Sequence, residues 1–370
     1  MPNDLPQDMD SIVDRRMFAW LAASAVLGRP RMALAQQMGK AARIGVLLPW
    51  AGPTPEDSVH IESERPAYRD LGWVEGQNLF VERRWAGPDP RRWREVAVEF
   101  KALQVALIVT VGTPAISVAR EGAPGVPIVM VQAGDPVGAG FAKSLAHPGG
   151  DLTGTSAVGE EMFGKQLELL VSVVPRAARV GIMMNPSNPA NGFFHQVLSQ
   201  RARHLGVDLD RMDVATKEEL EPAMSRARGS ALLVVGDPMF AAQSARIAEL
   251  ALRLRIPSIC MERYYVKAGC LMSLGSNPEW HWREVRSFID KILRGAKPAD
   301  LPIRQPLEFE FVLNATTARA LGLTIPQSVL LRADEVILAG GVRSCLLPPS
   351  RPCLSRTHRR GQKAGPDPTR

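Results

Sequence analysis

Polar and aromatic side chains stand directly after several short apolar runs of this chain, where they could bind a small polar molecule. Each position alone reads as an ordinary turn, because proline or glycine accompanies most of them. If the apolar runs are strands of parallel sheets, however, these side chains converge at the carboxyl ends of the strands and could hold a zwitterionic ligand. The candidate ligand-binding residues are Thr113, Pro114, Asp135, Asn185, Asp237, Glu262 and Tyr264.

The stretch Val111-Gly112-Thr113-Pro114-Ala115 leads from an apolar run into a predicted helix. Free backbone N–H groups at a helix start, together with the Thr113 hydroxyl, suit a carboxylate. Alternatively, the hydroxyl of Thr113 simply caps the helix. The sequence leaves both interpretations open.

Motifs that would indicate catalysis are incomplete. Residues Gly159 to Lys165 have the spacing of a phosphate-binding loop, but Gln166 stands where Ser or Thr is required. The six histidines are scattered, with no pair at zinc-ligand spacing, so the sequence predicts no metal site and no cofactor. Cys260 and Cys270 are expected to be buried thiols, with a disulfide between them as the alternative.

Short apolar runs alternate with longer amphipathic segments, which predicts parallel sheets with helices on both faces. The first set has strands at 43–48, 79–85, 106–111 and 128–131, with helices at 62–71, 93–103 and 114–121. The second set has strands at 179–184, 208–213, 231–235 and 258–261, with helices at 161–173, 192–205, 218–227 and 240–254. The predicted fold class is therefore α/β, with two doubly wound parallel-sheet lobes and a ligand cleft at the carboxyl ends of their strands.

The N-terminal residues 1–35 have the layout of an export signal. Arg15 and Arg16 precede a short apolar segment and the small residues Ala33-Leu34-Ala35. The paired arginines favour the twin-arginine route. We therefore expect a periplasmic protein whose mature chain begins near Gln36.

Most of the positive charge of the chain lies at its C-terminal end. Residues 338–370 carry a net charge of +6, against +7 for the whole chain. They show no apolar period, so we expect a basic disordered tail. Residues 1–40 carry a net charge of +1, so the body from 41 to 337 is neutral, which argues against nucleic acid as a partner.

An ordered series of motifs runs along the body of the chain. They are LGWVEGQN at 71–78, GTPA at 112–115, PIVMV at 127–131, GDPVG at 134–138, HPGGDLTG at 147–154, NPSNP at 185–189, DKILRGAKPADLP at 290–302 and ALGLTIP at 320–326. From about residue 42 to 337 the chain resembles the family of ABC transporter substrate-binding proteins that includes the tryptophan-binding TrpX-like proteins. Leu274 departs from the family pattern, in which members usually carry Tyr.

This resemblance implies a type I periplasmic-binding-protein fold, in which two lobes joined by a hinge close on a small solute such as an amino acid. It places 41–155 and about 276–302 in one lobe, and 156–275 and about 303–337 in the other. It also implies that Thr113 and its helix start bind a carboxylate, that Asp237 or Glu262 binds an ammonium group, and that Tyr264 stacks on or covers the ligand. The implied partner is an ABC transporter permease in the membrane, and the protein is expected to be a monomer.

Two other functions would use the same cleft. The first is an extracytoplasmic ligand-sensing subunit of a signalling system. The second, weaker alternative is an enzyme in which Asp135, Asp237 or Glu262 acts as an acid or base. Because the catalytic motifs are incomplete, we expect a binding protein and not an enzyme.

Overall fold

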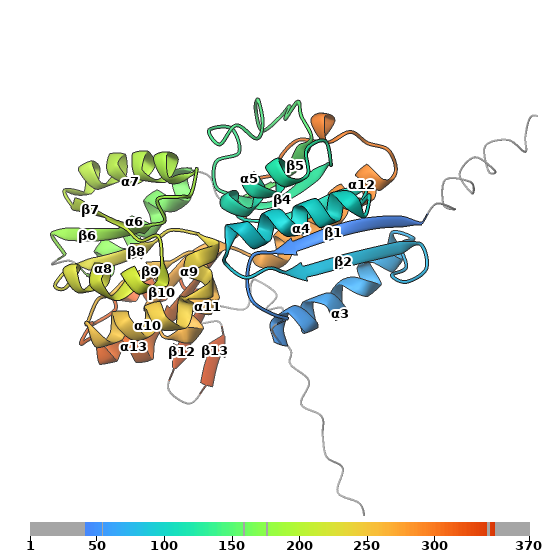
Figure 1. Ribbon diagram of the computed structural model, residues 1–370. Coiled ribbons are helices and arrows are strands. Elements are labelled where there is room, and N and C mark those ends of the chain that lie inside the picture. The colour runs from blue at the N-terminus through green and yellow to red at the C-terminus, as the bar shows by residue number, and fades with distance from the viewer. Residues whose placement is uncertain (1–40, 54, 158–159, 175–176, 339–340, 345–370) are drawn as a thin grey trace, which may run out of the picture.

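The computed structural model describes residues 41–53, 55–157, 160–174, 177–338 and 341–344. The predicted export signal lies outside these described residues, as does residue 345 onward of the predicted tail. The described chain forms two α/β lobes that lie side by side (Figure 1). Within the described part of the chain, we find no helix that is both long enough and apolar enough to cross a membrane.

Lobe 1 is built on a five-stranded parallel sheet with the order β2-β1-β3-β4-β5. Its strands are β1 (Ala42–Leu48), β2 (Leu79–Trp85), β3 (Leu107–Val111), β4 (Ile128–Ala133) and β5 (Leu152–Ser156). Its helices are α3 (Pro55–Asp70), α4 (Pro90–Ala102), α5 (Thr113–Gly122) and α12 (Pro278–Leu293), the last of which returns from far along the chain. One face of the sheet packs on α4 and α5, and the other packs on α12.

Lobe 2 is built on an eight-stranded sheet with the order β13-β12-β11-β10-β9-β8-β6-β7. Its strands are β6 (Arg179–Met184), β7 (Asp208–Asp213), β8 (Ala231–Val234), β9 (Ser258–Cys260), β10 (Met272–Ser276), β11 (Phe309–Asn314), β12 (Glu335–Leu338) and β13 (Gly341–Ser344). Its helices are α6 (Glu160–Val173), α7 (Asn191–Leu205), α8 (Leu220–Arg226), α9 (Pro238–Ala242), α10 (Ser244–Arg253), α11 (Arg263–Ala268), α13 (Ala315–Ala320) and α14 (Gln327–Leu330). The pairs β10–β11 and β12–β13 are antiparallel, and the other pairs are parallel.

Helix α4 illustrates how the sequence produces these layers. Asp89 caps its start by accepting a hydrogen bond from the Arg91 N–H at 2.9 Å, and Pro90 occupies the first turn. Its buried side chains, spaced three and four residues apart, form one apolar face; they are Trp93, Val96, Ala97 and Phe100. A Cβ added to Gly45 of β1 would lie 2.5 Å from the Phe100 ring, so this glycine allows α4 to approach the sheet closely.

The structure differs from the sequence-based prediction in several details. Residues 341–344 form β13, so the prediction of a disordered segment from 338 onward is wrong for this stretch, because its backbone pairs with the edge of β12. The single helix predicted at 240–254 is two helices, α9 and α10, which meet at Gln243. Helix α3 begins at Pro55, seven residues before the predicted start at 62.

Three chain segments cross between the lobes and form the hinge: β5 to α6, β10 to α12, and the segment from 301 to 308 that enters β11. The Ser156 N–H donates to the Arg304 carbonyl at 2.9 Å, which joins the first and third segments. His281 joins the first and second, because its Nδ1 lies 2.9 Å from Thr155 Oγ1 and its Nε2 lies 2.6 Å from Ser276 Oγ. Burial lowers the pKa of His281 to about 3.

Candidate functional site

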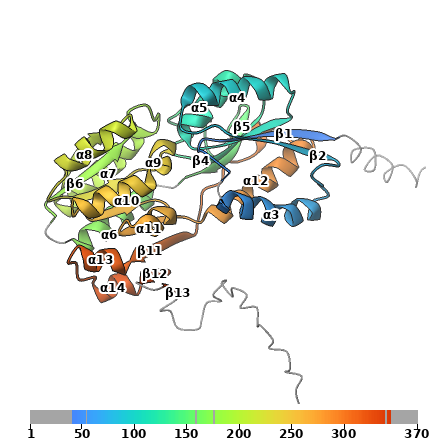
Figure 2. The same cartoon turned by 60° about the horizontal axis from the view of Figure 1, so that its bottom comes forward.

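The loops that follow the parallel strands of the two lobes meet where the lobes contact each other, at the predicted position of the ligand cleft. A Cβ added to Gly112, after β3, would lie 3.1 Å from Pro238 Cγ, after β8. A Cβ added to Gly134, after β4, would lie 2.7 Å from Ala190 Cβ and 2.7 Å from Phe194 Cζ, which belong to the start of α7. The lobes therefore touch along the strand ends, in a closed arrangement. Figure 2 shows α9 beside lobe 1.

Thr113 ties two loops of lobe 1 together at the floor of this cleft. Its Oγ1 accepts a hydrogen bond from the Gly134 N–H at 2.8 Å, and the residue is buried. The residue at the N-cap of α5 is Gly112, whose positive φ of 81° suits glycine. The alternative that Thr113 caps the helix is therefore wrong. Pro114, also buried, occupies the first turn of α5.

Asp135 shapes the loop after β4. Its Oδ1 accepts a hydrogen bond from the Gly138 N–H at 2.8 Å, and the side chain is half-buried. A Cβ added to Gly138 would lie 2.0 Å from Asp135 Oδ2, so a side chain at this position would displace the Asp135 carboxylate. Asp135 follows Gly134, whose N–H donates to Thr113, so Asp135 lies near Thr113 at the cleft edge of lobe 1.

Asp237 is the centre of a buried hydrogen-bond network in lobe 2. Its carboxylate accepts from Asn185 Nδ2 at 3.1 Å, from Asn188 Nδ2 at 3.0 Å and from the Met239 N–H at 2.8 Å. Burial raises the pKa of Asp237, and these hydrogen bonds oppose the shift. The network joins the loops after β6 and β8 into one surface of the cleft.

Asn188 belongs to this network but is absent from the residues chosen from the sequence. The signal was available, because Asn188-Pro189 repeats the Asn-Pro pattern of Asn185-Pro186 three positions later. Its Oδ1 also accepts from the Ala190 N–H at 3.0 Å, next to the contact with Gly134. Asn188 therefore fixes the segment of lobe 2 that touches lobe 1.

Glu262 and Tyr264 follow β9 at the start of α11. Burial raises the pKa of Glu262 to about 7, and the nearby Tyr264 hydroxyl opposes the shift. Tyr264 exposes 38% of its surface and stacks on Tyr265, with ring centroids 4.8 Å apart. This corner of lobe 2 therefore offers a titratable carboxyl group and an accessible aromatic ring.

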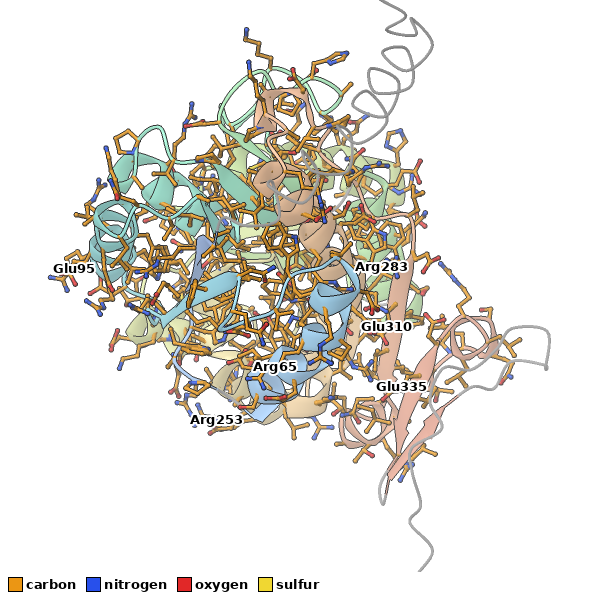
Figure 3. The ribbon with its side chains drawn as sticks, turned by 90° about the vertical axis from the view of Figure 1, so that its right-hand side faces the viewer. Arg65, Glu95, Arg253, Arg283, Glu310 and Glu335 are labelled. Carbon is orange, nitrogen blue, oxygen red and sulfur yellow. The ribbon has the colours of Figure 1, made fainter. Side chains whose placement is uncertain are left out.

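Arg263 stands between these two residues but is held elsewhere. It pairs with Glu310 at 2.7 Å and also with Glu335. Glu310 and Glu335 lie near each other on the neighbouring strands β11 and β12 (Figure 3). The cation of Arg263 is thus engaged away from Glu262.

The corresponding corner of lobe 1 carries two tryptophans that the sequence-based selection missed. Trp50 follows β1 and Trp85 ends β2, and both donate an indole N–H to Asp57 Oδ2, at 3.1 Å and 3.0 Å. Both stand at strand ends, as Thr113 does, but most of the candidate ligand-binding residues were polar. Aromatic residues at strand ends were the available signal.

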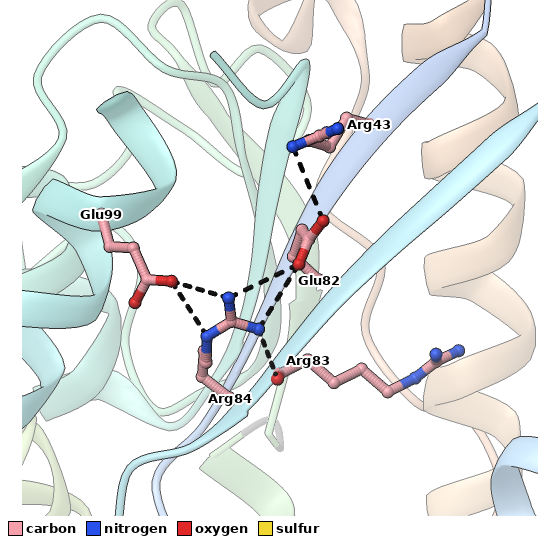
Figure 4. Close-up of polar contacts among 5 residues, drawn as sticks. All are labelled: Arg43, Glu82, Arg83, Arg84 and Glu99. Carbon is pink, nitrogen blue, oxygen red and sulfur yellow. Dashed lines mark hydrogen bonds and ion pairs between the residues drawn. The ribbon is translucent and has the colours of Figure 1, made fainter. Parts of the chain in front are cut away.

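Other charges of lobe 1 are paired within the lobe. Arg84 contacts Glu99 at 2.6 Å and Glu82 at 3.5 Å, and Glu82 also lies 3.7 Å from Arg43 (Figure 4). Hydrogen bonding to Glu99 raises the pKa of Arg84. Among the described residues no group of three or more His, Cys, Asp or Glu side chains is placed to bind a metal ion. Cys260 and Cys270 are buried free thiols.

Two α/β lobes joined by three crossing segments, with the strand-end loops of both facing one cleft, define a type I periplasmic-binding-protein fold. Residues 64–337 match the family described as ABC transporter substrate binding protein. The chain belongs to this family, whose members are solute-binding proteins and not enzymes.

Individual relatives have known ligands. A tyrosine-binding protein of Clostridioides difficile (strain R20291) is 27% identical over 259 residues, which cover 70% of this chain and 74% of that protein. An ABC domain from Streptococcus pneumonia in complex with L-Trp has a TM-score of 0.74 at 24% identity, covering 80% of this chain and 100% of that one. A ligand-free, open substrate binding protein with adhesive properties from Clostridium difficile has a TM-score of 0.57 at 26% identity, covering 77% of this chain and 96% of that one.

Proposed function

We propose that this protein captures an amino acid between its two lobes outside the cytoplasm and delivers it to an ABC transporter permease. The observation that carries the proposal is the meeting of the strand-end loops of both lobes, Gly112 with Pro238 and Gly134 with Ala190. A ligand that contacts the loops of both lobes stabilises the closed form relative to the open form. The permease can then distinguish the closed, ligand-bound protein from the open, ligand-free protein. The tyrosine-binding relative and the L-Trp complex support an amino acid as the solute.

The chemistry of the site suits a zwitterion with one face on each lobe. The N-terminal turn of α5, which begins at Thr113, is suited to bind the carboxylate of the ligand, because helix starts present unpaired backbone N–H groups. Glu262 is suited to bind the ammonium group of the ligand, because the neighbouring cation of Arg263 pairs with Glu310 and Glu335. Asp237 mainly holds the loops of lobe 2 together, because its carboxylate already accepts three hydrogen bonds from that lobe.

Export remains part of this proposal. The layout of residues 1–35 supports periplasmic localisation by the twin-arginine route. Fractionation of cells that express the full chain tests it: recovery in the periplasm is expected, and retention in the cytoplasm contradicts it. Replacing Arg15 and Arg16 with Lys should block export by this route.

A thermal-shift panel of L-amino acids, sugars and nucleosides tests the binding function. A ligand at 100 times its dissociation constant should stabilise the folded chain by about 2.7 kcal/mol. We expect one or a few amino acids to do so and to be recovered chemically unchanged. Stabilisation by sugars or nucleosides alone, or conversion of the ligand to a product, would contradict the proposal.

A further inference from the structure

Glu262 lies beside the point where the two lobes touch. A Cβ added to Gly236, which follows β8, would lie 3.9 Å from Glu262 Oε1. Two residues further along the same loop, Pro238 Cγ lies 3.1 Å from the position of a Cβ on Gly112, just before α5 of lobe 1. The carboxyl group of Glu262 and the start of α5 therefore come from opposite lobes and flank one contact.

No cation of the described chain pairs with this carboxyl group. The neighbouring residue, Arg263, pairs with Glu310 at 2.7 Å and also with Glu335. Within the described ranges Glu262 has no ion-pair partner, and the hydroxyl of Tyr264 is the side-chain group that favours its ionised form. The charge of an ionised Glu262 would therefore be buried without a positive partner.

The described elements packed around α11 bring no positive charge to Glu262. Helix α10 packs on α11, but the arginines of α10 pair with Glu221 of α8. Strand β10 contains no titratable side chain. Glu310 of β11 is held by Arg263, and Lys267 of α11 is exposed. The titratable groups that act on Glu262 or lie beside it are two phenols, a thiol and a second carboxyl group, those of Tyr264, Tyr265, Cys260 and Asp237.

A buried carboxyl group without a cation keeps its proton to an unusually high pH, because its ionised form loses hydration. For Glu262, burial raises the pKa to about 7. The ammonium group of an amino acid would be the first cation to reach this carboxyl group, and an opposite charge within about 4–6 Å favours the ionised form. Ligand binding and loss of the proton from Glu262 should therefore favour each other.

We propose that the protein releases a proton when it captures an amino acid: the ammonium group of the ligand displaces the proton of Glu262, which passes to the solvent. This inference rests on the proposed amino-acid-binding function and adds a regulator of the same site, the pH of the surrounding solution. Because protons and ligand compete, affinity should rise with pH up to about 7 and level off above it.

Calorimetric titration of the full chain tests this inference. The probe is the tightest binder among the common L-amino acids other than histidine, whose side chain itself titrates in this range. At pH 6, comparison of two buffers with different ionisation enthalpies should show release of about one proton per bound amino acid. The affinity at pH 7.5 should be at least about tenfold higher than at pH 5.5.

Variants assign the proton to its residue. Glu262→Gln should release no proton and should bind the probe equally at both pH values, because the amide cannot ionise. Tyr264→Phe removes the hydroxyl that favours the ionised form, so the midpoint of the affinity profile should move to higher pH. This variant serves if Glu262→Gln does not bind or fold. Glu308→Gln, at an exposed position, is the control and should keep the wild-type profile.

The outcomes separate the two proposals. If none of the amino acids binds the wild-type chain, the proposed function fails and this inference fails with it. If an amino acid binds without proton release at pH 6 and with equal affinity at pH 5.5 and 7.5, only the coupling to protons is overturned. Proton release that persists in Glu262→Gln, or an unshifted midpoint in Tyr264→Phe, assigns the proton to another group and also overturns it.

Discussion

Glu262 combines burial with a position at the cleft, and its ionisation should be visible in the stability of the protein. Burial raises its pKa from 4.5 to about 7, so the folded chain keeps a proton that the unfolded chain has released. Between these values stability falls as pH rises, by up to about 3 kcal/mol in total. A ligand ammonium group beside Glu262 would favour the carboxylate and reduce this penalty.

We predict that Glu262→Gln removes this contribution. Urea unfolding at pH 5, 6, 7 and 8 should show that the variant gains stability relative to wild type as pH rises through 7, because the amide cannot ionise. Glu308→Gln, at an exposed position, is the control and should follow the wild-type curve. If the curves of wild type and Glu262→Gln stay parallel over this range, the raised pKa is wrong.

The roles of individual residues were predicted less completely from the sequence than the fold was. Thr113, Asp135, Asn185, Asp237 and Glu262 follow the ends of strands, as the sequence predicts, and their role in ligand binding stays a prediction. It could not be predicted that Asp237 is occupied by Asn185, Asn188 and Met239, because these contacts depend on loop conformations that periodicity does not determine. Trp50 and Trp85 were overlooked because single tryptophans near strands usually belong to a core.

At the scale of elements, His281 connects α12 with the first two hinge segments. It is buried between Thr155 and Ser276, and burial lowers its pKa to about 3. The neutral imidazole can donate at one nitrogen and accept at the other, which suits two hydroxyl partners. The hinge therefore depends on a histidine that stays uncharged at physiological pH.

This pKa predicts acid sensitivity. Below pH 6.5 the unfolded chain takes up a proton at His281 and the folded chain does not, so the contribution is complete above 6.5 and is lost as pH falls towards 3. The slope is about 1.4 kcal/mol per pH unit. His281→Gln should flatten the acid limb of the stability profile measured by urea unfolding, while the exposed His147→Gln should not. Identical acid limbs for wild type and His281→Gln would refute this role.

The alternation of strands and helices was predictable because apolar runs and amphipathic periods are local features. The four strands predicted in each lobe are present, with ends shifted by a few residues. Strand β5 of lobe 1 was not predicted, and neither were four strands of lobe 2: β10, β11, β12 and β13. The four strands of lobe 2 extend its sheet by antiparallel and long-range pairing, β10 with β11 and β12 with β13, which no local period reveals.

At the scale of the whole molecule, the proposed function requires the lobes to close on each other. Gly134 lies at the point of contact with Ala190 and Phe194. Its backbone does not require glycine, because its φ is not in the left-handed region. An added methyl group would therefore act mainly by separating the lobes.

We predict that Gly134→Ala weakens ligand binding at least tenfold, because the new Cβ would lie 2.7 Å from both Ala190 Cβ and Phe194 Cζ. Small-angle X-ray scattering with saturating ligand should show a larger radius of gyration than for wild type. Gly150→Ala, in lobe 1 with no atom within 4 Å of the added Cβ, is the control. Wild-type affinity and compactness in Gly134→Ala would mean that closure does not occur at this contact.

A crystal structure of the full chain with the amino acid that stabilises it most in the thermal-shift panel tests ligand capture between the lobes. We predict electron density for the ligand between the lobes, with contacts from the loops after β3 and β4 on one side and from those after β8 and β9 on the other. Density bound to one lobe alone, or at a surface away from these strand ends, would contradict it.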